Sequence, residues 1–435
     1  MKKIYFLLCF LLVLSAGLLY AETDNEQQET DTYRNLETFA NILNLLQQHY
    51  VDEIKSNDVI IGAINGMLVS LDPHSSYMSS EDFKELQEET KGSFSGIGIE
   101  ITIRDGVLTV VSPIEGTPAY RQGLQAGDQI IRINGQLTKN MTLMNAVKLL
   151  RGDRGDEVTI SVHRKGLQGL QDIVLVRDVI PVHSVKFMEL EPGLLYIRIT
   201  NFQSTTTRDF RKALQKAEKK HQVNGLILDL RNNPGGLLDQ AVKVSDIFLD
   251  NGIIVSTKGR NPDEDMIFEA HRGTGRYVFP MIVLVNGGSA SASEIVAGAL
   301  QDHGRAIIVG TQTFGKGSVQ TIVPLPDGAG LRLTTARYYT PSGDSIQATG
   351  ITPDMVVPFE KSADEKTGGD TNWSLREKDL PHHFENNNGK EKKKNKQADS
   401  EQQEIEQRLA MDNQLRTALY LMKNLKNIQT NDGLN

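Results

Sequence analysis

The spacing of apolar residues changes several times along this chain. Over residues 36–50 and 59–68 the apolar positions recur at helical spacing. Between residues 92 and 177 the pattern becomes one of short strands, and after residue 178 strand patterns and helix patterns alternate. Such alternation predicts an α/β core, whose functional site lies on the turns that lead from strands into helices.

The predicted elements follow from this spacing. In the β-rich stretch we expect two helices, at 119–122 and 143–150, and five strands, at 97–103, 107–111, 129–133, 158–162 and 173–176. In the α/β stretch we expect strands at 194–199, 226–230, 281–285 and 306–309. The helices between and after them are predicted at 210–219, 238–248 and 291–300.

These patterns predict a multidomain α/β protein. Its 435 residues, 39% of them apolar and 23% charged, can bury two or three cores. We expect a helical N-terminal subdomain over 30–90, a β-rich domain over 92–177 inserted before a mixed α/β core over 178–358, a charged linker over 359–400 and an amphipathic helix over 401–435. The apolar faces of the terminal helical segments could dock on the chain itself or join copies in a homo-oligomer.

The N-terminus has the composition of an export signal. Lys2 and Lys3 precede an apolar run over residues 4–20, and Ala21 stands before a polar, acidic segment. This predicts a secretory signal peptide over 1–21 and a location in the periplasm or cell envelope. The run is also long enough to remain as an uncleaved anchor that contacts the membrane, so both interpretations stay open.

Charge and cysteine content exclude several classes of function. A net charge of −8 argues against a nucleic-acid-binding protein. The single cysteine, Cys9, lies inside the N-terminal apolar run, which leaves no thiol nucleophile, disulfide or cysteine metal site beyond it. No pair of histidines has the H-E-x-x-H spacing of a zinc site, and we predict neither a metal nor a cofactor.

The residues that suggest chemistry lie between Asn286 and Gln320. Three alternating serines, Ser289, Ser291 and Ser293, precede a helix pattern, and Lys316 follows a strand pattern on a turn bounded by glycines. A serine at a helix start and a lysine on such a turn can act as a nucleophile and a base, because packing requires neither residue there.

Two other interpretations of this stretch must be considered. Ser291 and Glu294 have the spacing of a capping box, which would make the serine a helix cap only. Gly310 to Lys316 reads G-x-x-x-x-G-K, which is most of the phosphate-binding loop of an NTPase. The next residue, Gly317, lacks the hydroxyl that should bind magnesium, so we disfavour a nucleotide site.

The β-rich stretch resembles a PDZ domain. The run LQAGDQIIRINGQ, with its turn glycines and alternating apolar residues, carries the resemblance. Gly96, Ile97, Gly98 and Ile99 stand where that family has its carboxylate-binding loop. In such loops, backbone N–H groups bind a peptide's terminal carboxylate while the peptide pairs with the next strand.

Three further motifs, together with this PDZ-like stretch, resemble the C-terminal processing peptidases, also called tail-specific proteases. They are DLRNNPGG at 229–236, GSASASEI at 288–295 and TFGKGSVQ at 313–320, and the resemblance covers roughly residues 33–358. It implies that Ser291 is the nucleophile, that Lys316 is the base and that Gln320 orients the lysine.

The resemblance also implies an oxyanion hole. One donor would be the N–H of Ala292, and the other the N–H of Gly235 or of Gly236, which the sequence leaves open. We therefore expect an exported serine endopeptidase with a Ser–Lys dyad, which hydrolyses peptide bonds near the C-termini of protein or peptide substrates. Its PDZ domain would bind substrate C-termini or gate the site. A PDZ scaffold with an inactive peptidase domain is the alternative.

Overall fold

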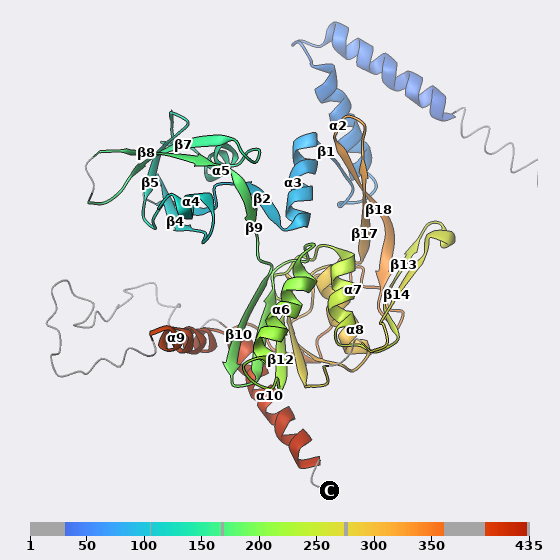
Figure 1. Ribbon diagram of the computed structural model, residues 1–435. Coiled ribbons are helices and arrows are strands. Elements are labelled where there is room, and N and C mark those ends of the chain that lie inside the picture. Colours follow the sequence, from blue (N-terminus) through green and yellow to red (C-terminus); the bar gives the residue numbers. More distant parts are fainter. Residues whose placement is uncertain (1–30, 105, 167–168, 274–276, 361–395, 433–435) are drawn as a thin grey trace, which may run out of the picture. The chain divides into compact units, whose positions relative to one another are not determined.

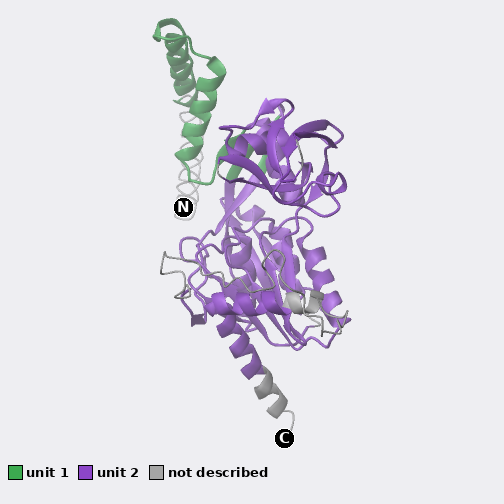
Figure 2. Ribbon diagram, turned by 90° about the vertical axis from the view of Figure 1, so that its left-hand side faces the viewer, with its two compact units in different colours: residues 1–78, 322–325, 330–333 green, residues 79–321, 326–329, 334–435 purple. Residues whose placement is uncertain are grey.

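A computed structural model describes residues 31–432, except for 105, 167–168, 274–276 and 361–395 (Figure 1). The predicted signal peptide and all but the edges of the predicted linker lie outside the described residues. The chain forms two compact units, which Figure 2 colours separately. The first comprises the chain up to Met78 with 322–325 and 330–333, and the second comprises the rest.

The first unit contains two helices in the stretch where the sequence has helical apolar spacing. Residues 31–49 form one helix and α2 (Ser56–Val69) forms another. β1 (Ser76–Met78) pairs antiparallel with residues 330–332, the start of β18 (Gly330–Tyr339). Many large apolar side chains of the first helix are exposed: Tyr33, Leu36, Phe39, Ile42, Leu45 and Leu46. Helical spacing therefore identified the helix but not what covers its apolar face.

The second unit begins with α3 (Ser80–Lys91), which is too polar to be found from apolar spacing. The Ser79 hydroxyl accepts the Asp82 N–H at its start, and Gly92 ends it with φ 75°. Next, β2 (Ser93–Gly96) pairs antiparallel with β9 (Asp178–Pro181). These paired strands enclose the sequence of the PDZ domain, which is thus an insertion closed at its base.

The PDZ domain is built on one sheet. Its strands β3 (Ile99–Arg104), β4 (Val107–Pro113), β5 (Gln129–Ile133), β7 (Glu157–His163) and β8 (Gln171–Val176) follow in that order, with β6 (Gln136–Leu137) beside β5. Two helices, α4 (Pro118–Arg121) and α5 (Leu143–Leu150), accompany the sheet. Alternate residues such as Val158, Ile160 and Val162 are buried in its core, as period-two patterning requires.

The centre of the second unit is a six-stranded sheet. Its order is β10 (Val185–Glu191), β11 (Leu194–Ile199), β12 (Gly225–Asp229), β15 (Met281–Val285), β16 (Ile307–Gly310) and β19 (Met355–Val356). β10 is antiparallel to β11 and the other neighbours are parallel. A sheet of this kind brings the carboxyl ends of β12, β15 and β16 to one edge, where the predicted site residues follow.

Helices cover both faces of this sheet (Figure 1). α6 (Thr206–Glu218), α7 (Leu238–Asp246) and α8 (Ala292–Asp302) pack on one face against residues such as Ile197 and Leu228. The C-terminal segment packs on the other face, where Leu415 and Met422 meet Ile227 and Ile282. Buried on both faces, the strands are apolar at successive positions, which agrees with the continuous apolar runs in the sequence.

The C-terminal segment contains two helices where the sequence pattern predicted one. α9 (Lys396–Met411) begins inside the predicted linker, and α10 (Asn413–Asp432) follows after a break at Asp412. Asp412 caps α10, because its Oδ1 accepts the Leu415 N–H at 2.9 Å. None of the helices among the described residues combines the length and the apolar character that crossing a bilayer requires.

A second sheet was not predicted. β13 (Ile253–Gly259) pairs with β14 (Met266–Glu269) and with the later part of β18, while β17 (Ser318–Pro324) also pairs with β18. The strand β17 begins two residues after Lys316 and carries Gln320. This sheet therefore positions the lysine turn.

Candidate active site

The two outer serines of the serine stretch are bound to the neighbouring turn. The Ser289 hydroxyl donates to the Leu230 carbonyl at 2.8 Å, and the Ser293 hydroxyl donates to the Asn233 carbonyl at 3.0 Å. Both side chains are fully buried. Their hydroxyls thus hold the serine stretch against the turn after β12. Ser291 differs from these two serines in its backbone conformation and in its exposure.

Ser291 stands at the start of α8 in an unusual backbone conformation. Its φ is 53° and its ψ is −113°, and its side chain is not fully buried, with 9% of the residue exposed. A positive φ is uncommon for a residue with a Cβ, and such strain is concentrated at functional sites. A nucleophilic serine on a sharp turn between a strand and a helix has this geometry.

The glycine turn at 234–236 lies directly against Ser291. A Cβ at Gly235 would stand 2.9 Å from the Ser291 Cβ and 2.8 Å from the Ala290 carbonyl oxygen, and φ there is 104°. The Ala290 N–H also donates to the Asn233 carbonyl at 2.9 Å. Only glycine permits this close approach, which brings the DLRNNPGG motif and the SASAS motif together as predicted from the fold class.

The two glycines of that turn differ in their hydrogen bonding. The Gly235 N–H donates to Asn233 Oδ1 at 2.9 Å, so a side chain within the turn already accepts it. A Cβ at Gly236 would stand only 2.1 Å from the Phe202 carbonyl oxygen, at φ 135°. Both positions therefore require glycine, for different reasons.

Glu294 joins the serine stretch to the lysine turn. This fully buried carboxylate accepts the Ser291 N–H at 2.7 Å, which is the Glu294 half of the predicted capping box. It also accepts the Lys316 N–H at 2.9 Å, the Gly315 N–H at 2.7 Å and the Thr313 hydroxyl at 2.5 Å. One side chain thereby fixes the backbones of Ser291 and Lys316 relative to each other.

The lysine turn is shaped by close contact with the segment after β18. A Cβ at Gly317 would stand 2.3 Å from the Gln347 N, and one at Gly315 would stand 3.1 Å from the Ala348 carbonyl carbon. Lys316 between them is partly buried. In β17, the Gln320 amide donates to the Ser318 hydroxyl at 2.8 Å.

The same contacts argue against a nucleotide site. In a phosphate-binding loop, the backbone N–H groups before the helix point at phosphate oxygens. Here the N–H groups of Gly315 and Lys316 bind Glu294, a negatively charged side chain of the protein itself. The turn then continues into a strand, β17, rather than a helix.

A groove with a different character lies in the PDZ domain. A pocket of about 150 Å³ is lined mostly by apolar side chains and by the predicted carboxylate-binding loop: Phe94, Gly96, Ile97, Gly98, Ile99, Ile101, Val147, Leu150 and Arg151. The Ala119 and Ile114 N–H groups bind the carbonyls of Ile97 and Gly98, each at 2.9 Å, and thereby fix the loop. β3 stands at the end of the described strand order, which leaves an edge for a peptide strand.

Three family models match the chain in this arrangement. Peptidase family S41 matches residues 193–357, the PDZ domain matches residues 85–163, and the N-terminal domain of the activating protease CtpB matches residues 15–82. The carboxy-terminal-processing protease of Bartonella bacilliformis is 47% identical over 371 residues, which are 85% of each chain. This chain belongs to the carboxy-terminal processing proteases.

Two further proteins are similar to this chain. The carboxy-terminal processing protease CtpA of Bacillus subtilis is 36% identical over 76% of this chain and 72% of its own. A solved photosystem II D1 C-terminal processing protease is 32% identical over 74% of this chain and 92% of its own, with a TM-score of 0.43. As a carboxy-terminal processing protease, the protein is a serine-type peptidase with a PDZ domain, as the sequence motifs predicted.

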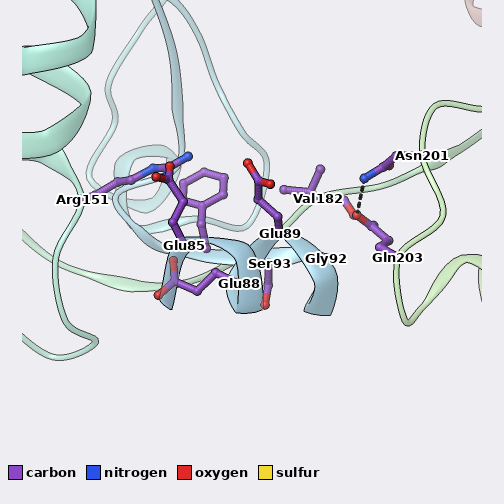
Figure 3. A pocket seen from close by; sticks show the side chains of 10 residues that line it. Glu85, Glu88, Glu89, Gly92, Ser93, Arg151, Val182, Asn201 and Gln203 are labelled. Atoms are coloured by element: carbon purple, nitrogen blue, oxygen red, sulfur yellow. Dashed lines mark hydrogen bonds and ion pairs between the residues drawn. The ribbon is translucent and has the colours of Figure 1, made fainter. Parts of the chain in front are cut away.

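The protease has another pocket, of about 340 Å³, away from the predicted catalytic residues. Glu85, Glu88 and Glu89 of α3 line it with Arg151, whose guanidinium lies 2.8 Å from Glu85 and 4.9 Å from the Phe94 ring centre (Figure 3). The acidic side chains make this pocket different from the apolar PDZ groove, and none of the residues predicted for catalysis lines it.

A buried ionic cluster follows β12 in the protease. Arg231 binds Asp229 through Nε and Nη2, at 2.9 and 2.7 Å, and binds Asp412 through Nη1 and Nη2, at 2.8 and 2.6 Å. Burial by itself would lower the pKa of Arg231, but its hydrogen bonds to the two carboxylates outweigh burial and raise that pKa. Burial and the nearby Asp229 charge also raise the pKa of Tyr196 to about 12.

Sequence reasoning missed part of this site. It treated Glu294 only as a member of a capping box and gave Thr313 and Asp412 no role. A capping-box signature is local, and nothing in its spacing indicates that the same carboxylate binds a turn about twenty residues later. The position predicted for the PDZ loop, in contrast, came from its glycines together with the LQAGDQIIRINGQ run that follows it.

Proposed function

We propose that the protein is an exported endopeptidase, in which Ser291 and Lys316 form a catalytic dyad that hydrolyses peptide bonds near the C-termini of protein substrates. The observation that carries this proposal is the difference among the three serines. Ser289 and Ser293 donate to carbonyls of the neighbouring turn, whereas Ser291 occupies the strained position at the start of α8. Glu294 supports the pairing, because it binds the backbone N–H groups of both Ser291 and Lys316.

In the proposed reaction, Ser291 Oγ attacks the substrate carbonyl carbon and its proton passes to the neutral amine of Lys316. The lysine then gives this proton to the nitrogen of the leaving peptide, and an acyl-enzyme remains. Water attacks the acyl group in the same way and regenerates the serine. Gln320, on the strand after the lysine, orients the amine in this proposal.

The negative oxygen of the tetrahedral intermediate needs donors beside Ser291. The Ala292 N–H belongs to the first turn of α8, where N–H groups have no intrahelical acceptor and the helix dipole favours negative charge. The second donor comes from the glycine turn. Because Asn233 Oδ1 already accepts the Gly235 N–H, the hydrogen bonding favours Gly236 as that donor.

The PDZ domain selects substrates in this proposal. An apolar C-terminal side chain enters the groove between β3 and α5, and the N–H groups of the loop from Gly96 to Ile99 bind the terminal carboxylate. The N-terminal run after Lys2 and Lys3 exports the protein to the periplasm or cell envelope and is either removed or kept as an anchor.

Cleavage of an unfolded protein substrate, followed by mass spectrometry of the products, tests the dyad. Ser291→Ala should abolish cleavage, with a capping cost of about 1 kcal/mol. Ser289→Ala and Ser293→Ala are the comparison variants: each removes a buried hydrogen bond to the turn after β12, costs about 1–3 kcal/mol of stability and should keep most of the activity below its melting temperature.

Two outcomes would contradict the proposal. Full activity in Ser291→Ala would show that another group is the nucleophile. An intact substrate after incubation with wild-type protein would favour the alternative of an inactive PDZ scaffold.

A further inference from the structure

The C-terminal segment reaches the turn that carries the proposed oxyanion donor. An arginine has five N–H donors. In Arg231 all of them are used: Asp229 accepts two, Asp412 accepts two and Gln414 Oε1 accepts one, at 2.9 Å. Asp412 and Gln414 lie at the start of α10, so more than half of the donors bind a segment far along the chain.

This contact is buried and specific. The Arg231 and Asp412 side chains are 7% and 16% exposed, and Gln414 is 1% exposed. Gln414 also donates to the Val357 carbonyl at 2.7 Å, which fixes its own amide. Burial would raise the pKa of Asp412, but Arg231 outweighs it and lowers that pKa, so the carboxylate is charged at neutral pH.

From Arg231 the turn leads directly to the proposed donors. Asn233 follows two residues later. Its side-chain amide donates to the Ile199 carbonyl at 2.9 Å, and its backbone carbonyl accepts the Ser293 hydroxyl. Gly235 and Gly236 follow. The turn is thus fixed at Asn233 by the sheet and the serine stretch, and at Arg231 by Asp229 and the C-terminal segment.

We propose that Asp412 and Gln414 are positioning residues: through Arg231 they hold the 231–236 turn in the geometry in which its glycine N–H binds the developing oxyanion. This inference rests on the proposed function of that turn. It assigns to the C-terminal segment a part in the chemical step, beyond packing on the sheet. Loss of the contact should then reduce stabilisation of the tetrahedral intermediate and leave substrate binding unchanged.

Asp412→Asn in the full chain separates this role from helix capping. Asparagine caps helices as well as aspartate does, so the Leu415 N–H keeps its acceptor. The asparagine amide, however, places an N–H donor where Arg231 needs an acceptor, and it has no negative charge. We expect kcat to fall about tenfold, less than the loss of a whole oxyanion donor, and KM to change less than twofold.

A peptide boronate provides a second readout, because it forms a tetrahedral adduct on a nucleophilic serine. Its affinity should fall by about the same factor as kcat, while binding of an uncleaved peptide to Ser291→Ala/Asp412→Asn should match binding to Ser291→Ala. Gln414→Ala removes one acceptor and should show a smaller effect in the same direction. If Asp412→Asn does not fold at the assay temperature, Gln414→Ala provides the test instead.

Glu404→Gln is the matched control, since it removes the charge of a carboxylate in the same segment whose side chain is 63% exposed. Wild-type kcat and boronate affinity in both Asp412→Asn and Gln414→Ala would overturn the inference. So would a loss confined to KM or to melting temperature. If Ser291→Ala itself kept full activity, the proposed function would fail instead, which is a different result.

Discussion

The proposed peptidase site and the PDZ groove are built in opposite ways. Around Ser291, the backbone is held by buried polar side chains, and Glu294 alone accepts four hydrogen bonds. The PDZ groove is an apolar pocket of about 150 Å³ beside an open strand edge. One region is held by buried hydrogen bonds, and the other is an apolar surface beside an unpaired strand edge of the described sheet.

This difference predicts how each region responds to change. Reactions depend on interactions that strengthen in the transition state, so a small displacement at the peptidase site should lower kcat. Peptide pairing and apolar contact are made equally in the bound ground state, so changes in the groove should raise KM and leave kcat nearly constant. Three sets of variants can break or sharpen this contrast.

The largest effect is expected at Lys316. A lysine can take a proton from Ser291 only when neutral, and its reference pKa is about 10.4. Lys316→Arg should be as inactive as Lys316→Ala, with a loss of about 10³-fold or more, because guanidinium stays protonated at any useful pH. In the wild type, the rate of cleavage should rise with pH through one ionisation below about 10.4.

The Lys316 experiment measures initial rates between pH 6 and 10 with one peptide substrate. Substantial activity in Lys316→Arg, or a flat pH profile in the wild type, would assign the base to another group. Retained melting temperature in both variants would show that the loss is chemical.

A smaller loss of activity is expected for Glu294→Gln. The new amide group would face backbone N–H groups, so at least one of the four hydrogen bonds is replaced by a contact between two donors. We expect kcat to fall about 10²-fold, comparable with the loss of one oxyanion donor, with little change in KM.

The control is Asp302→Asn. Asp302 is an exposed carboxylate that accepts the Ser342 N–H at the other end of α8. The variant carries the same charge change and should keep nearly wild-type kcat. Equal losses in the two variants, or a Glu294→Gln effect on KM alone, would contradict the idea that this carboxylate aligns the serine and lysine turns.

The smallest effect is expected in the PDZ groove. A substrate with an apolar C-terminus should be cleaved with a KM about tenfold below that of the same chain amidated, since amidation removes the charge that the loop is proposed to bind. Val147 lies on α5 and lines the groove, so Val147→Asp should remove most of this preference.

Val174→Asp is the matched control, because this valine of β8 is exposed, at 49%, and does not line the groove. Steady-state rates for free, amidated and Asp-terminated substrates measure the preference. Equal KM values for all three in the wild type would mean that the PDZ domain controls access to the peptidase site without reading the C-terminus.

The sequence predicted the fold best where burial was complete. Strands such as Leu194–Ile199 and Met281–Val285 have the predicted bounds, because a strand with helices on both faces is apolar at nearly every position, with Arg198 as the exception. The second sheet was missed, since β17 and β18 carry mixed, partly exposed side chains without regular alternation. α3 was missed for a related reason: its sequence is polar around the whole helix.

For the site, the motifs identified the turns but not the contacts between them. Gly235 was a candidate because of the family pattern, whereas its contact with Ser291 depends on the pairing of β12 with β15. The contact between Arg231 and Asp412 joins residues 181 positions apart, and no local pattern predicts such a pair. Long-range polar contacts of this kind follow from the completed fold.

That separation also sets an order of events during synthesis. The ribosome makes Arg231 and reaches Asp412 only 181 residues later, which takes roughly 10 to 40 s at the usual rate of translation. The growing chain therefore contains its proposed serine and lysine well before the carboxylate that completes the arginine cluster. On the proposed role of the arginine cluster, the chain becomes fully active only after Asp412 has left the ribosome and joined Arg231.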